Sequence, residues 1–193
     1  MSEPCSSPTA PVRAKTLRVF YALWPGEEAR RTLLALAKDV ATAGRGRAPP
    51  PQNMHLTLAF VGEVAAERLP ALQAIGARAA AAGSPFTLRF DRLGSFRDSG
   101  IAWLGTGAAE PALQALVDGL AAGLAADGFP VERRPFRAHV TLARRCARPP
   151  VAADVPAVIW PVEAFTLTAS ELARGGSQYR TLAAWPLAGT ASG

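Results

Sequence analysis

One short segment occurs twice in this chain, and the pair constrains the possible fold and chemistry more than any other feature. The first copy is His55-Leu56-Thr57-Leu58-Ala59 and the second is His139-Val140-Thr141-Leu142-Ala143. The chain has two histidines, and each begins one copy. They lie 84 residues apart (139 − 55) in a chain of 193, which indicates a duplicated unit. We therefore predict one site that is assembled from two related halves.

Each copy has the composition of a β-strand with one polar and one apolar face. Branched and aliphatic residues dominate, and alternate residues of a strand point to opposite faces. His55 and Thr57 therefore share a face, as do His139 and Thr141, while the aliphatic residues between them face a core. An imidazole, with a pKa of about 6.5, exchanges protons near neutral pH. Two imidazoles and two hydroxyl donors suit the acid–base hydrolysis of a phosphate ester.

The sequence offers no recognisable set of metal ligands. There is no third histidine, and Cys5 and Cys146 lack the close spacing of zinc-binding cysteines. We therefore expect a phosphodiesterase that needs neither a metal nor another cofactor.

The paired His-x-Thr-x segments resemble those of the 2H phosphoesterase superfamily. The chain is most similar to the bacterial and archaeal RNA 2′,3′-cyclic phosphodiesterases, once described as 2′-5′ RNA ligases. The resemblance implies an α+β fold with two lobes of antiparallel sheet, related by a pseudo-two-fold axis, and outer helices around a central groove. It spans residues 16–187 and includes Arg18–Leu23, His55–Val64, Leu93–Phe96, Trp103–Gly105, Phe136–Arg144, Ser170–Leu172 and Tyr179.

The resemblance also implies roles for the motif residues. His55 would donate a proton to the leaving oxygen and His139 would accept one from water, although the residues alone do not order the two. Thr57 and Thr141 would bind the phosphate; the alternative is that each is an ordinary strand threonine. The implied substrate is RNA that ends in a 2′,3′-cyclic phosphate, with tRNA fragments among the candidates. The implied product is a terminal 2′-phosphomonoester.

Other residues are weaker candidates. Arg144 follows His139 by five positions, so a regular strand would turn it away from the groove, and a strand end or a bulge would return it to the phosphate. Otherwise it is a surface arginine. Phe96, in a predicted loop, is either a stacking platform for a base or a core or lid residue. Tyr179 and Arg18 are weaker candidates still.

Several functions stay open from the sequence. The same groove could hydrolyse a cyclic mononucleotide or an ADP-ribose cyclic phosphate, or join tRNA halves as a 2′-5′ ligase. The protein could also be an RNA-binding module without catalytic activity. Intact His and Thr residues in both copies argue against a decayed site.

The net charge of +6 and the pI of about 10.3 suit an RNA partner. Only Lys15 and Lys38 are lysines, however, and a GC-rich genome would produce the same arginine-rich and alanine-rich bias. No run of about 18 apolar residues and no secretory signal is recognisable. We therefore expect a cytoplasmic monomer with free thiols and no membrane contact.

We predict a disordered tail over residues 1–15, one two-lobed domain over 16–187 and a C-terminal tail over 188–193. Helices are predicted over 27–43, 65–82 and 110–126, and a loop over 147–157. Strands are predicted over 16–23, 55–61, 86–90, 101–104, 164–172 and 178–185, and the segment from 135 to 143 leads into the second motif strand.

Overall fold

The computed structural model describes residues 16–173 and 176–188. The predicted tail over 1–15 and residues 189–193 of the predicted C-terminal tail lie outside the described residues. The elements are β1 (Thr16–Leu23), α1 (Glu27–Gly44), β2 (Leu56–Ala65), α2 (Leu69–Ala82), β3 (Phe86–Phe96), β4 (Ile101–Thr106), α3 (Pro111–Ala126), β5 (His139–Ala143), β6 (Ala153–Val162), β7 (Ala164–Ala173) and β8 (Gly176–Pro186).

The described strands form a single antiparallel sheet in the order β6-β3-β4-β5-β2-β1-β7-β8. The two motif strands, β5 and β2, lie at its centre, and each has three further strands on its outer side. One residue pair, Leu56 with Val140, joins β2 to β5. The predicted α+β class and antiparallel sheet are confirmed, and the two halves around the groove belong to one continuous sheet.

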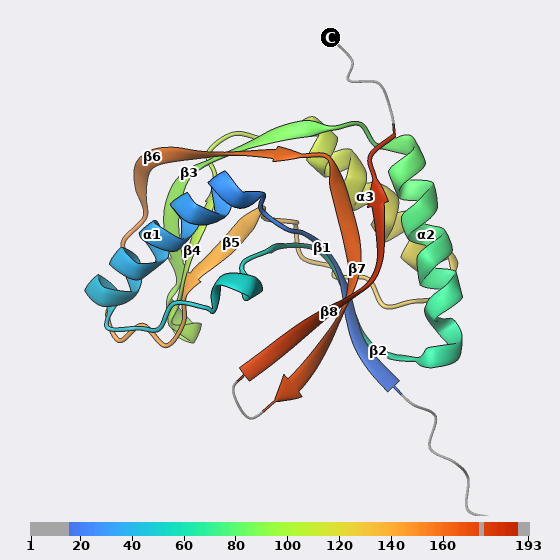
Figure 1. Ribbon diagram of the computed structural model, residues 1–193, viewed down its shortest axis with the longest axis horizontal. Helices are drawn as coiled ribbons and strands as arrows, with labels where there is room; N and C mark the ends of the chain where they lie inside the picture. The colour runs from blue at the N-terminus through green and yellow to red at the C-terminus, as the bar shows by residue number, and fades with distance from the viewer. Residues whose placement is uncertain (1–15, 174–175, 189–193) are drawn as a thin grey trace, which may run out of the picture.

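Three helices pack on the described sheet. α1 packs on β5 and β6, α2 packs on β7 and β8, and α3 packs on α2 and β2. Figure 1 shows α1 on one side of the molecule and α2 with α3 together on the other. Apolar residues at helical spacing, such as Leu33, Ala37 and Val40 in α1, are buried against the strands. None of the described helices is long and apolar enough to cross a membrane.

The two motif strands share a local irregularity as well as a sequence. The register between β1 and β2 slips directly after Thr57, which leaves Leu58 without an opposite residue. The register between β4 and β5 slips directly after Thr141, which leaves Leu142 without one. A β-bulge therefore follows the threonine in both copies, so the duplication extends to backbone geometry.

Several elements differ from the prediction, and two of the differences have a clear physical reason. The predicted loop over 147–157 overlaps β6, a strand that contains Pro156 and Pro161 and was not predicted. β6 is an edge strand, so the missing proline N–H groups cost little on its unpaired side. The predicted helix over 65–82 begins only at Leu69, because β2 continues to Ala65 and a 3₁₀ turn follows it.

Phe96 is also placed differently from the prediction. It is the last residue of β3 and pairs with Ile101 of β4, so it belongs to a strand and not to a loop. Gly94, two residues earlier in β3, lies against the Trp103 ring, which a Cβ at this position would overlap. This glycine permits close packing within a regular strand.

We predict that Leu56→Ala lowers the free energy of unfolding by about 2–5 kcal/mol, because the side chain is fully buried where the two halves of the sheet meet. Urea unfolding measures the change. The control is Leu172→Ala, at a side chain that is 86% exposed, which should change stability by less than about 0.5 kcal/mol. Equal effects of the two substitutions would contradict the central role of this pair.

Candidate active site

The four motif side chains lie on one face of the central strands. The antiparallel pair of Leu56 and Val140 places His55 alongside Thr141 and Thr57 alongside His139. Both members of the pair are fully buried, so the flanking histidines and threonines project from the opposite face. All four line one groove with a volume of about 780 Å³. The structure therefore brings together the two copies that the sequence separates.

Each histidine ring is anchored to the main chain in the same way. The Nδ1 atom of His55 lies 2.8 Å from the carbonyl oxygen of Asn53, and Nδ1 of His139 lies 2.8 Å from that of Arg137. A carbonyl oxygen only accepts, so each Nδ1 carries a hydrogen and donates it. This leaves Nε2 of each ring for proton exchange, as an acceptor in the neutral ring and a donor in the imidazolium.

Aromatic side chains surround His55. The ring centroids of Phe20, Trp24 and Tyr179 each lie 5.1 Å from the centroid of its imidazole. Burial among these rings lowers the pKa of His55, because an imidazolium is poorly solvated there. The hydrogen bond to Asn53 opposes this effect, and the positive charges of Arg144 and His139 add to it.

His139 has a more open setting. On the neighbouring strand β4, Gly105 pairs with His139. At the corresponding place in the other half, Trp24 follows directly after Leu23, the partner of Leu56, and lies beside His55. One aromatic ring, that of Phe96, lies edge-on to His139 at a centroid distance of 5.4 Å. The two imidazoles thus have equal anchors and unequal surroundings.

The bulge in β5 returns Arg144 to the groove. Leu142 and Ala143 are consecutive in the sequence and both are fully buried, so the alternation of faces is interrupted there. Arg144 then lines the groove together with the motif residues. Arg18 and Tyr179, the weakest candidates from the sequence, also line it.

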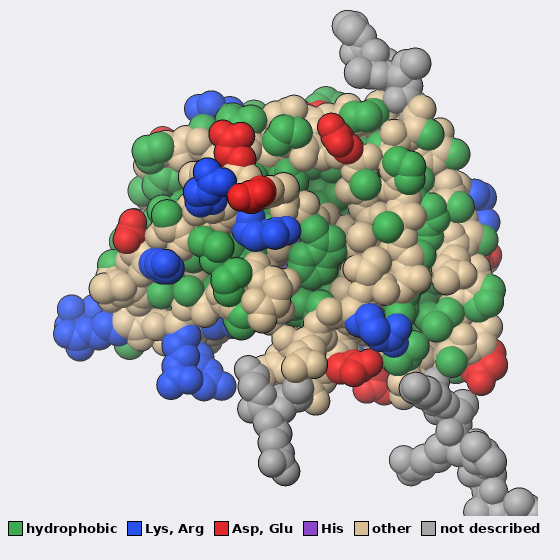
Figure 2. Space-filling view, viewed as in Figure 1, with side chains coloured by type: hydrophobic (Ala, Val, Ile, Leu, Met, Phe, Trp, Pro, Cys, Tyr) green, Lys and Arg blue, Asp and Glu red, His purple; other side chains and the backbone are tan. Residues whose placement is uncertain are grey.

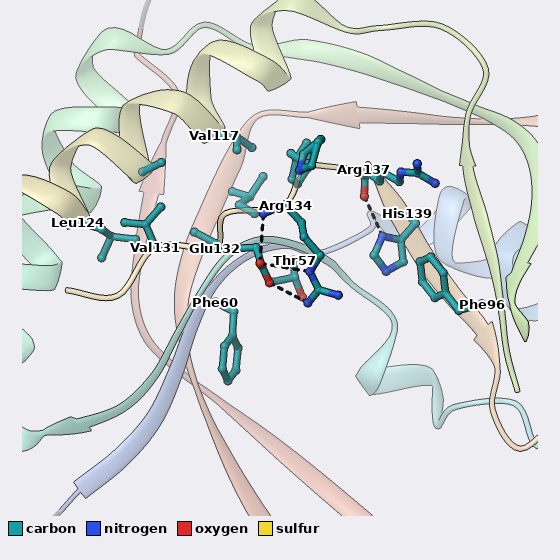
Figure 3. Close-up of a pocket in the computed structure, with 15 residues that line it drawn as sticks. Thr57, Phe60, Phe96, Val117, Leu124, Val131, Glu132, Arg134, Arg137 and His139 are labelled. Atoms are coloured by element: carbon teal, nitrogen blue, oxygen red, sulfur yellow. Dashed lines mark hydrogen bonds and ion pairs between the residues drawn. The ribbon is translucent and has the colours of Figure 1, made fainter. Parts of the chain in front are cut away.

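A second cavity of about 550 Å³ begins at Thr57 and His139. Its interior is apolar, because Val117 and Leu124 of α3 form one wall. Phe96 lines this cavity and its ring contacts that of His139, and the residue is 37% exposed. Figure 3 shows α3 above this cavity and His139 with Phe96 beside it.

The segment between α3 and β5 forms the rim of this apolar cavity. Figure 3 shows Glu132 and Arg134 of this segment near Thr57. Nη2 of Arg134 lies 3.0 Å from Oε2 of Glu132, and hydrogen bonds from Arg134 lower the pKa of Glu132 to about 2. This ion pair is fully exposed, so solvent screens it strongly.

Comparison with known proteins assigns the family. A sequence model of the LigT-like phosphoesterases matches residues 23–103 and again residues 104–185. An RNA 2′,3′-cyclic phosphodiesterase of Thermus thermophilus is 37% identical over 185 residues, which covers 90% of this chain and 91% of that protein. The enzyme of the same name from Escherichia coli is 36% identical and covers 88% of this chain and 96% of that protein.

This chain belongs to the LigT-like phosphoesterase family. Among solved structures, E. coli LigT complexed with 3′-AMP superposes with a TM-score of 0.81 at 32% identity, over 90% of this chain and 99% of that one. The two family matches begin at Leu23 and Leu104, which pair with Leu56 and Val140 respectively. The repeat in the family model therefore coincides with the repeat in the sheet.

Several residues at the site of this LigT-like phosphoesterase were not singled out in the sequence. Asn53 binds His55 through its carbonyl oxygen, and its side-chain Nδ2 donates to the carbonyl of Ser177 at 2.8 Å. Trp24 was interpreted only as a strand end, yet its Nε1 donates to Thr166 at 2.8 Å behind His55. Every residue type has a main-chain carbonyl, so the identity of residue 53 could not indicate its contact with His55.

Charge is distributed unevenly between the surface and the groove of this LigT-like phosphoesterase. Figure 2 shows Lys and Arg side chains scattered among acidic ones on one face of the molecule. The groove, in contrast, is lined by Arg18, Arg47, Arg144 and Arg145. Within residues 16–173 and 176–188, no three His, Cys, Asp or Glu side chains are grouped to hold a metal ion.

We predict that His55 titrates in NMR with a pKa below the ordinary value of 6.5. Arg144→Gln should raise this pKa, because it removes a positive charge that disfavours the imidazolium. The two histidine signals are assigned with a His139→Gln variant. Arg148→Gln, at an exposed arginine outside the groove lining, should leave the titration unchanged. A wild-type value above 6.5 would contradict the described burial.

Proposed function

We propose that this protein hydrolyses 2′,3′-cyclic phosphate ends of RNA to terminal 2′-phosphomonoesters, and that it does so without a metal ion. The observation that carries this proposal is the pairing of two anchored imidazoles with two threonines in a single groove. The names of the relatives from T. thermophilus and E. coli support the substrate class. The arginines of the groove supply attraction for an anionic RNA end.

In the proposed reaction, Nε2 of His139 takes a proton from a water molecule, whose oxygen attacks phosphorus in line with the bond to O3′. That bond breaks, and Nε2–H of His55 gives its proton to O3′. The phosphate stays on O2′. The hydroxyls of Thr57 and Thr141, with the guanidinium of Arg144, hold the non-bridging oxygens and stabilise the charge that develops on them.

The surroundings of His55 determine the pH range in which it can act as the acid. Because burial lowers its pKa, the imidazolium form of His55 is a stronger acid than an ordinary one and gives up its proton readily. The same shift means that His55 loses this proton as the pH rises through a value below 6.5. The acid role therefore requires activity to decline over that range.

The apolar cavity beside His139 supports a place for the terminal base. A nucleobase has large apolar faces and stacks on aromatic rings with little dependence on sequence. Phe96 lies at the entrance of this cavity, within reach of a nucleoside whose phosphate lies between the histidines. We therefore propose that the base stacks on Phe96 and covers the mouth of the cavity.

We predict that His55→Ala and His139→Ala each lower kcat by roughly 10²–10⁴-fold on an oligonucleotide that ends in a 2′,3′-cyclic phosphate. The kcat of the double variant should be only slightly lower than that of the less active single variant, because both groups act in one step. End-group analysis of the wild-type product should find a 2′-phosphate. Thermal unfolding checks that each variant folds.

Two results would oppose this scheme. Full loss of activity on treatment with EDTA, restored by a divalent ion, would show a metal requirement. A His55→Ala variant that binds the oligonucleotide and turns over as fast as wild type would assign the groove to binding alone.

We also predict that Phe96→Ala raises KM for adenosine 2′,3′-cyclic phosphate by about tenfold, because one stacking contact is lost. Phe96→Trp keeps an aromatic platform and should retain most of the affinity. Steady-state kinetics measures KM and kcat separately. A loss confined to kcat would instead indicate that Phe96 acts by orienting His139, which its ring contacts.

A further inference from the structure

The reaction groove has two chemically different ends. On one side of the motif residues lies the apolar cavity, with walls from α3. On the other side lie Arg47, Arg144 and Arg145, and no carboxylate is present among the described residues that line the groove. Arg18, the fourth arginine of the lining, lies over the ring of Phe60, a residue that lines both the groove and the apolar cavity. A substrate with one apolar end and one anionic end would therefore bind in a defined orientation.

Arg47 forms an unusual pair at the cationic end. Its N–H donates to the carbonyl of Arg144 at 2.9 Å, and the N–H of Arg144 donates back to the carbonyl of Arg47 at 2.9 Å. Residues that exchange both bonds have Cα atoms about 5.5 Å apart and side chains on the same face. Like charges in such positions repel each other. Among the described residues, no carboxylate forms an ion pair with either arginine, so their mutual repulsion is not offset by an acidic side chain.

This pair is built into the fold. The loop that carries Arg47 approaches β5 closely at Gly46, where an added Cβ would lie 2.7 Å from Sγ of Cys146 and 2.9 Å from the carbonyl oxygen of Arg144. The N–H of Gly46 also donates to the carbonyl of Ala41 in α1 at 2.8 Å. The two arginine side chains therefore start from paired backbone positions at the groove, where a bound anion would offset the repulsion between their charges.

The shape of a nucleotide indicates which anion fits there. The base leaves the ribose at C1′, which is bonded to C2′, and the preceding nucleotide is attached through C5′, which is carried by C4′, the neighbour of C3′. With the 2′,3′-cyclic phosphate between the histidines and the base at the apolar cavity, the 5′ side of the ribose points toward the opposite end. That end is the one lined by Arg47 and Arg144.

We propose that Arg47 binds the phosphodiester that joins the terminal nucleotide to the one before it, while Arg144 serves the reacting phosphate. This inference rests on the proposed function. It assigns to Arg47 the preference for an RNA strand over a cyclic mononucleotide, because a mononucleotide has no phosphate at this position.

The test compares three substrates: adenosine 2′,3′-cyclic phosphate, the dinucleotide ApA with a 2′,3′-cyclic phosphate end, and the same dinucleotide with an uncharged methylphosphonate linkage. Arg47→Gln should lower kcat/KM on the normal dinucleotide by about tenfold, the effect of one lost charge-assisted hydrogen bond. It should change neither of the other two values. Arg47→Lys keeps the charge and should fall between wild type and Arg47→Gln on the dinucleotide.

Salt dependence gives a second readout. The slope of log kcat/KM against log salt for the normal dinucleotide should become shallower by about 0.7 in Arg47→Gln, as expected for one phosphate contact on a single strand. Arg148→Gln is the matched control, since Arg148 is exposed and lies outside the groove lining. It should change neither the activity ratio between substrates nor the slope.

The outcomes separate this inference from the proposed function. If the wild-type protein hydrolyses the cyclic phosphate of neither the mononucleotide nor the dinucleotide, the proposed function itself is overturned. If the wild type is active and Arg47→Gln lowers kcat/KM equally on all three substrates, or on none of them, only the placement of Arg47 is overturned.

Discussion

The backbone pairing of Leu56 with Val140 is the contact on which the rest of the site depends. This pair aligns two strands that are distant in the sequence and places a histidine of each beside a threonine of the other. A slip of one residue in either strand would turn its polar face into the core and its aliphatic face into the groove. Burial of both aliphatic side chains makes such a slip costly, so packing on one face maintains the register of the proposed catalytic groups on the other.

Duplication gives the two histidines the same anchors, and the neighbouring strands then make them different. Each ring is bound through Nδ1 to a carbonyl two residues earlier, and a bulge follows each threonine. Trp24 stands beside His55, and Gly105 stands beside His139. A large ring in one half and a glycine in the other produce unequal solvation of two otherwise equivalent imidazoles. The desolvation of His55 lowers its pKa, so His55 holds the proton that the proposed acid role requires only at low pH, and gives it up as a stronger acid than an ordinary imidazolium.

The distribution of polarity along the groove matters more than the net charge of the chain. On the face that Figure 2 shows, basic side chains are accompanied by acidic ones, whereas the arginines of the groove face no carboxylate among the described lining residues. Opposite Arg47 and Arg144, α3 and the segment before β5 enclose an apolar cavity. A nucleotide carries an apolar base and anionic phosphates at opposite ends, and the groove offers matching surfaces on both sides of its two histidines.

The sequence by itself determined the two motif strands and their polar faces, because these follow from residue type and a period of two, and its resemblance to the 2H phosphoesterases implied the α+β class. It also located the helices to within a few residues. It could not decide whether Arg144 faces the groove, since the bulge at Leu142 depends on pairing with β4. Nor could it indicate β6, whose prolines are tolerated only because this strand lies at the sheet edge, or Arg47, whose partner is almost a hundred positions away. Tertiary structure decided these features, because each depends on which distant backbone segment pairs with the residue. The local sequence does not specify that partner.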